Sequence, residues 1–174
     1  VRSTGEIHLN STWDEGIPDE IPHDHLYGLA WNPMSLIEVL KRLPGAATAR
    51  RVGTDSLTPT FAQLLPMAFP NAEIMVPAKD WEFWMSEENA AKAESNQMMK
   101  NYFANVRKIY AGIESKVTRY DWGKEVVSGI TSIAAPGHTP GHTAFAVASG
   151  DSKILIQSDV TNIPEFFLRN PDWH

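Results

Sequence analysis

The sequence contains no cysteine and no long apolar run. The absence of cysteine excludes disulfide bonds, thiolate metal ligands and a cysteine nucleophile. It also fits a cytoplasmic protein, which is the location that we expect. No stretch approaches the roughly 20 apolar residues that span a bilayer, so we expect no membrane partner. Positive charge is scarce, since the net charge is −6. This argues against a nucleic-acid partner, because phosphate binding needs a basic face.

Three signatures of other chemistries are missing as well. The sequence has no G-x-S-x-G elbow, which sets aside a Ser-His-Asp hydrolase. It has neither the phosphate-binding G-x-x-x-x-G-K nor the dinucleotide-binding G-x-G-x-x-G. Histidines and carboxylates therefore remain as the residues that could carry chemistry.

The first part of the chain predicts short strands and two helices. We expect a strand at residues 6–9, an irregular loop over 10–33 and a second short strand at 51–55. The first helix is predicted to start at Asn32 and Pro33 and to stop at Pro44. The second is predicted to be capped by Thr58, and Pro66 should end or kink it.

The second part predicts two more helices followed by a run of strands. Residues 74–76 read as a strand and 79–85 as a short helix, and residues 99–110 show the clearest helical spacing. Strand-like runs follow at 116–121, 129–135, 143–149 and 153–159. The last two are almost continuously apolar, which predicts strands buried on both faces in a layered sandwich with helices outside.

A loop rich in proline, glycine and histidine lies between two of these runs. It reads Pro-Gly-His-Thr-Pro-Gly-His-Thr from Pro136 to Thr143, and Asp159 follows the last run. Glycine and proline give such a loop a defined backbone path, so it can hold an imidazole rigidly, as a metal ligand requires. We expect residues 129–159 to form at least three adjacent strands, and the loop, strand, turn and strand between His138 and Asp159 can bring both residues to one edge of the sheet.

This loop and the carboxylate resemble the third and fourth metal motifs of the metallo-β-lactamase-fold hydrolases. The resemblance covers residues 72–174 and implies an αββα sandwich with two zinc ions. It implies that His138 is a metal ligand and that Asp159 is the catalytic carboxylate bridging the metals. Two members of one ligand set should have their side chains within about 8 Å of each other. Family members usually have glycine before this Asp, where Ser158 stands here. His142 is expected to fix a ligand or a loop carbonyl instead of binding metal.

The other metal motifs of that family are not found. Its H-x-H-x-D-H motif is absent from the sequence, and His174 is not taken as the late histidine ligand. His23 and His25 form an H-x-H pair but lack the following D-H and the preceding buried strand, so we favour two loop histidines over two ligands. The metal site is therefore expected to be incomplete.

Residues 1–76 resemble a different family, the N-terminal domain of the creatinase/Xaa-Pro peptidase enzymes. The resemblance rests on residues 11–16, 27–33 and 51–59. That domain is not catalytic but packs against a catalytic domain and helps to form a dimer. We therefore expect a hybrid, with a partial creatinase-N-like α/β segment at 1–70 and a partial metallo-β-lactamase-like domain at 71–174. Two segments of different origin should share little core.

Three functions follow as alternatives. The first is a metal-dependent hydrolase of an ester, lactone or thioester-like small molecule, with zinc as cofactor and an incomplete site. The second is a non-catalytic creatinase-type module that packs on a partner or dimerises. The third is a hybrid fragment without activity. We favour the first as the ancestry of the chain and leave open whether it is an active enzyme.

Overall fold

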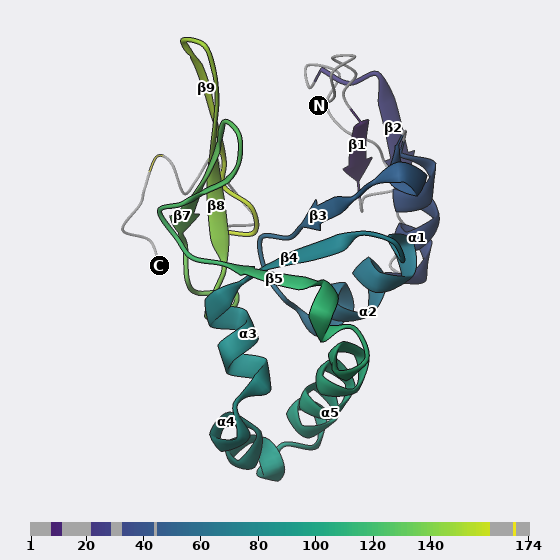
Figure 1. The fold of residues 1–174 in the computed structure, drawn as a ribbon, viewed down its shortest axis with the longest axis vertical. Helices are drawn as coiled ribbons and strands as arrows, with labels where there is room; N and C mark the ends of the chain where they lie inside the picture. The colour runs from purple at the N-terminus through teal and green to yellow at the C-terminus, as the bar shows by residue number, and fades with distance from the viewer. Residues whose placement is uncertain (1–7, 12–21, 29–32, 44, 161–168, 170–174) are drawn as a thin grey trace.

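The computed structural model describes residues 8–11, 22–28, 33–43, 45–160 and 169 (Figure 1). The described chain is a mixed α/β structure with three separate sheets. The five α-helices are α1 Pro33–Arg42, α2 Pro59–Ala68, α3 Ala78–Met85, α4 Glu87–Lys92 and α5 Gln97–Ala111. Short 3-10 helices lie at Ala46–Thr48, Ala93–Ser95 and Glu114–Lys116. None of the helices in this part of the chain has the length and apolar character needed to cross a bilayer.

The strands divide into parallel and antiparallel sheets. Strands β1 and β2 pair in parallel, and so do the three strands β3, β4 and β5. The remaining four form an antiparallel sheet in the order β6-β7-β8-β9. Their bounds are β1 His8–Ser11, β2 His25–Gly28, β3 Arg51–Gly53, β4 Glu73–Pro77, β5 Val117–Tyr120, β6 Glu125–Val127, β7 Ile130–Ala134, β8 Thr143–Ser149 and β9 Ser152–Ile156.

Local capping residues explain where the helices begin. The Thr58 hydroxyl accepts a hydrogen bond from the Phe61 N–H at 3.2 Å, and Pro59 occupies the first helical position. The Asn96 side chain caps α5 in the same way, as it accepts from two backbone N–H groups. The predicted cap of α2 and the predicted helix over α5 are thus confirmed, and the cap expected at Asn32 lies outside the described residues.

Pro66 lies inside α2, which continues to Ala68, so of the two predicted outcomes the helix does not end there. One local prediction needs correction. Residues 10–33 are not all loop, because β1 extends to Ser11 and β2 places residues 25–28 in a strand. β1 and β2 form strands because they pair with each other, with His8 opposite His25, and the local sequence pattern does not indicate this pairing.

The hydrophobic core lies between the parallel sheet and the helices. Figure 1 shows α3, α4 and α5 below β4 and β5, and β7, β8 and β9 of the antiparallel sheet at the upper left. Leu64 on α2, Val76 on β4 and Val106 on α5 are each at most 1% exposed and belong to one cluster. The cluster contains Ile37, Leu57, Ala62, Leu64, Leu65, Ala68, Phe69, Ala72, Ile74, Val76, Trp81, Trp84, Ala93, Phe103, Val106 and Tyr110.

This cluster contradicts the expectation that the two segments share little core. Its members come from both sides of residue 70, and β3 pairs with β4 so that Val52 lies opposite Ile74. Arg51 and Glu73 add an ion pair across the same two strands, with Nε and Oε2 2.7 Å apart. A sheet edge and apolar helix faces from the first segment are covered by the second, which is the arrangement that burial of apolar surface favours. The boundary at residue 70 stays a prediction about resemblance.

The antiparallel sheet confirms the three predicted strands within 129–159 but not their predicted burial. Strand β8 begins buried at Thr143 and ends exposed at Ser149. Strand β9 is exposed along its whole length, with Leu155 65% exposed. Among the described strands β9 is at the edge of its sheet, and α3, α4 and α5 lie on the far side of the parallel sheet. The full αββα layering is therefore not reached in the described residues.

Candidate functional site

The candidate site lies where the loop between β7 and β8 meets the end of β9. Backbone hydrogen bonds close the loop on itself, from Ala135 N to His142 O at 3.0 Å and from Gly137 N to Thr139 O at 3.1 Å. The Thr143 hydroxyl donates to the Gly141 carbonyl at 2.8 Å. These bonds satisfy the polar groups of a turn that proline and glycine make possible, so the loop holds its histidines in a defined geometry.

His138 and Asp159 lie together, as the sequence predicted. Their Nε2 and Oδ2 atoms are 3.4 Å apart, and the side chains are 45% and 53% exposed. Ser158, just before Asp159, has a φ of 59°, in the left-handed region that favours glycine. Glycine is therefore what the backbone geometry would prefer here, and serine accepts local strain in placing Asp159 beside His138.

The separation of these two side chains suits a shared metal ion. Two donors bonded to one tetrahedral zinc at about 2.0–2.2 Å lie about 3.4 Å apart, which matches the observed pair. Both side chains are open enough to solvent for an ion to enter. Within the described residues, however, no group of three or more His, Asp or Glu side chains could hold a metal ion. The geometry fits two zinc ligands of the three or four that a tight site uses.

His142 connects the loop to Asp159. Its ring is fully buried and lies 5.8 Å from that of His138 between centroids. Its Nε2 accepts a hydrogen bond from the Asp159 N–H at 3.1 Å, and Nδ1 is 2.8 Å from the Ala135 carbonyl oxygen. These two contacts require the tautomer with the proton on Nδ1, which then donates to Ala135. They are the kind of contact that the sequence prediction gave this residue, and they place Asp159 relative to the loop.

The carboxyl ends of strands in the parallel sheet contact the loop between β7 and β8 and its neighbours. The Thr143 N–H donates to the Asp55 carbonyl at 2.9 Å, just after β3. The Tyr120 hydroxyl, at the end of β5, donates to the Thr54 carbonyl at 2.7 Å, and burial raises the pKa of this phenol. Carboxyl ends of parallel strands meet at one edge of a sheet, and this edge is where sites in α/β proteins form.

Sequence reasoning missed one functional candidate, Asp80. This carboxylate is fully buried in the first turn of α3, where it receives hydrogen bonds from Thr139 and Gly141 of the loop. The available signal was an acid shortly after the apolar strand at 74–76 and directly before Trp81. A charged side chain at such a position needs partners, since an unpaired buried charge is unfavourable.

His23 and His25 lie in a different part of the described fold from the candidate metal ligands. His25 lies in β2, opposite His8 in β1, and His23 precedes that strand. Strands β1 and β2 form their own sheet, separate from the one that carries His138. Sequence reasoning favoured two histidines without a metal role, and this placement gives no reason to change that.

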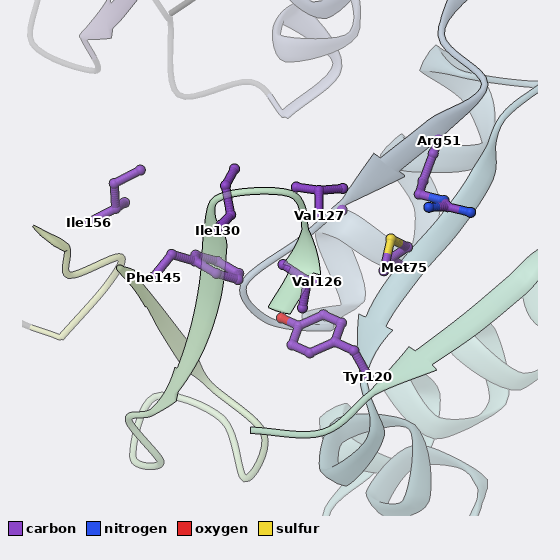
Figure 2. Close-up of a pocket in the computed structure, with 9 residues that line it drawn as sticks. Arg51, Met75, Tyr120, Val126, Val127, Ile130, Phe145 and Ile156 are labelled. Carbon is purple, nitrogen blue, oxygen red and sulfur yellow. The ribbon is translucent and has the colours of Figure 1, made fainter. Parts of the chain in front are cut away.

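A separate apolar cleft opens between the parallel and antiparallel sheets (Figure 2). It has a volume of about 320 Å³. Figure 2 shows Tyr120 beside Val126, with Met75 to one side of them. Its lining residues are Arg51, Gly53, Met75, Tyr120, Val126, Val127, Ile130, Phe145 and Ile156. Neither His138 nor Asp159 lines it, so the cleft is distinct from the candidate metal site.

Comparison with known proteins identifies the fold. No family model matches the chain, and no curated protein sequence matches it either. Among solved structures, the hydrolase AbOPH of the β-lactamase superfamily matches with a TM-score of 0.61 and 20% identity, over 73% of this chain and 46% of that chain. AidC, a dizinc quorum-quenching lactonase, matches with a TM-score of 0.53 and 25% identity, over 69% and 45%.

The chain therefore shares part of the fold of metallo-β-lactamase-superfamily hydrolases. It spans about half the length of these two structures. The resemblance of residues 1–76 to the creatinase N-terminal domain finds no support in these comparisons.

Proposed function

We propose that this protein has the function class of a metallo-β-lactamase-fold hydrolase, with zinc held by His138 and Asp159 and an ester, lactone or thioester-like small molecule as substrate. The observation that carries the proposal is the 3.4 Å separation of His138 Nε2 and Asp159 Oδ2. The loop between β7 and β8 and the end of β9 bring the pair together from two different strands. A dizinc lactonase among the structural neighbours supports zinc and this substrate class.

Each residue has a defined part in such a site. Zinc would supply a hydroxide near neutral pH and polarise the scissile carbonyl. His138 offers the Nε2 lone pair and Asp159 a carboxylate oxygen as ligands. His142 would contact neither zinc nor substrate, but its Nε2 accepts the hydrogen bond of the Asp159 backbone N–H. The half-exposed His138 and Asp159 side chains leave room for a substrate carbonyl at the metal.

The ligand set limits what the chain does alone. Two protein ligands leave a zinc ion mostly hydrated and poorly oriented. The sequence has no H-x-H-x-D-H motif to add more. We therefore expect the purified chain to bind less than one zinc tightly, and to hydrolyse lactone, thioester and β-lactam substrates no faster than a metal blank.

Elemental analysis after dialysis tests the metal site directly. Zinc retained by the wild-type protein should fall in His138→Ala and remain in His23→Ala, which is the matched control because it removes a histidine from another part of the fold. Equal zinc in the wild type and His138→Ala would contradict the metal role and favour the non-catalytic alternative. Two tightly bound zinc ions, with hydrolysis lost in both variants, would show a complete site that recruits His23.

A further inference from the structure

The Asp80 carboxylate is the centre of a built hydrogen-bond site beside the candidate metal ligands. Its Oδ2 accepts from the Leu57 N–H and the Thr139 hydroxyl, both at 2.7 Å. Its Oδ1 accepts from the Gly141 N–H at 2.5 Å. The side chain is 0% exposed. Three donors from two separate chain segments, Leu57 and the loop between β7 and β8, thus compensate a carboxylate that would be unfavourable to bury alone.

Gly141 fits against Asp80 so closely that no larger residue has room. A Cβ at position 141 would lie 2.6 Å from the Asp80 backbone nitrogen and 2.9 Å from its Cγ. Real Cβ atoms do not approach backbone this closely, so the close approach itself explains the glycine. The contact also defines how the loop sits on α3, because a shift of the loop in either direction breaks the hydrogen bond or creates a clash.

The three residues from Thr139 to Gly141 lie between His138 and His142 in the chain. Asp80 binds the first and last of them, and Gly141 is followed directly by His142. The His142 ring then receives the Asp159 N–H. A continuous path of contacts therefore runs from α3 through the loop to both candidate ligands.

We propose that Asp80 is a positioning residue, which sets the geometry of His138 relative to Asp159 without touching metal or substrate. Helix α3 is well suited to the task because Trp81 and Trp84 anchor it in the core. The effect on metal binding rests on the proposed function. The effect on loop geometry rests on the contacts alone.

Asp80→Asn is the sharpest variant because it keeps the shape of the side chain. In either orientation of the amide, its NH₂ group faces at least one backbone N–H, so one of the three hydrogen bonds is lost. Thr139→Val removes only the hydroxyl contact, and Thr139→Ser should restore it. Val106→Ala is the matched control, since Val106 is fully buried on α5 and lies outside this network.

Two measurements on the full chain separate the two claims. The first is the ¹⁵N spectrum of the His142 imidazole in metal-free protein, which reports the tautomer that the Ala135 and Asp159 contacts require. The second is the zinc dissociation constant, from competition with a chromophoric chelator. Asp80→Asn and Thr139→Val should mix the tautomers and weaken zinc about tenfold or more, as expected for residues that orient a ligand. Thr139→Ser should retain both wild-type results.

Val106→Ala should lower the unfolding temperature and leave both measurements unchanged at temperatures where it is folded. A folded Asp80→Asn or Thr139→Val with wild-type His142 signals and zinc affinity within twofold would overturn the positioning role. Should the wild type bind no zinc, the proposed function fails, and the His142 spectrum still decides the role of Asp80. If Asp80→Asn does not fold, Thr139→Val carries the decision.

Discussion

The parallel-sheet region (β3 to β5 with α1 to α5) and the antiparallel-sheet region (β6 to β9 with the loop at 135–142) bury their side chains very differently. Leu64 in the first is 1% exposed and Leu155 in the second is 65% exposed. Aromatic contacts reinforce the first region, as Trp84 lies 4.8 Å from Phe103 between ring centroids. The difference indicates that the first region carries most of the folding free energy, because apolar burial is the main favourable contribution.

The candidate site lies at the boundary between these regions and depends on both. The antiparallel-sheet region supplies His138 and Asp159, and both are partly exposed. The parallel-sheet region supplies Asp80 and the strand ends that hold the loop. A packed core beneath half-exposed candidate ligands keeps the site open to solvent and holds its side chains in one geometry.

The strongest test of the comparison uses the same substitution in both regions. Leu64→Ala should lower the free energy of unfolding by about 2–5 kcal/mol, because it leaves a cavity in a closed core. Leu155→Ala should change it by about 0.5 kcal/mol or less, because its side chain is already largely in water. Urea unfolding followed by tryptophan fluorescence measures both values. Equal losses would show that β9 is covered in solution.

A second pair compares two tryptophan hydrogen bonds. Trp84 Nε1 donates to the buried Leu57 carbonyl at 2.6 Å, so Trp84→Phe should cost about 1–3 kcal/mol by leaving that oxygen without a donor. Trp122 Nε1 donates to the Thr143 hydroxyl at 3.0 Å. Trp122→Phe should cost about 1 kcal/mol or less, because that hydroxyl keeps its bond to Gly141. Thermal unfolding followed by circular dichroism ranks the two, and the reverse order would contradict the comparison.

The smallest effects are expected from two buried tyrosines. The Tyr110 hydroxyl has no hydrogen-bond partner among the described residues, whereas Tyr120 donates to Thr54. Tyr110→Phe should therefore leave stability unchanged or raise it slightly, and Tyr120→Phe should lower it by about 1 kcal/mol. Chemical denaturation at neutral pH, with both variants beside the wild type, distinguishes these outcomes. A clear loss in Tyr110→Phe would show that its hydroxyl has a partner in solution.

The same pair predicts how stability depends on alkaline pH. Burial raises the pKa of both phenols in the folded protein. The unfolded chain ionises near pH 10 while the folded chain stays protonated, so the stability contribution is complete below about pH 10 and is lost as pH rises further. Each Phe variant should show a shallower alkaline loss than the wild type. Identical slopes in unfolding curves between pH 9 and about 11 would contradict the assigned burial.

Much of the site could be predicted from sequence because its information is local. The proline-glycine-histidine loop and the carboxylate after the second strand-like run resemble two family metal motifs, and that resemblance predicted His138 near Asp159, as the structure has them. Family members usually have glycine where Ser158 stands, and the structure finds Ser158 at positive φ. Asp80 was missed because its partners Leu57 and Gly141 are 23 and 61 residues away in the chain. No short pattern contains all three.

The burial of β9 was predicted wrongly for a physical reason. Three consecutive apolar residues, Ile154 to Ile156, have the composition of a strand covered on both faces. Composition shows only which side chains a strand could bury. Whether they are buried depends on where the strand lies in the sheet, and β9 lies at an edge. The expectation of two poorly connected halves failed similarly, because pairing of β3 with β4 depends on contacts across residue 70.

The sequence by itself determined the helix start at Thr58, the helix over residues 99–110 and the strands around the histidine loop, and its resemblance to a known family named the two candidate ligands. These features depend on capping, backbone freedom and residue chemistry, all of which act over a few neighbouring positions. Only the tertiary structure decided that one core joins both halves, that β9 is exposed and that Asp80 supports the loop. Those features depend on which distant surfaces exclude water together, and this depends on the packing of the whole chain.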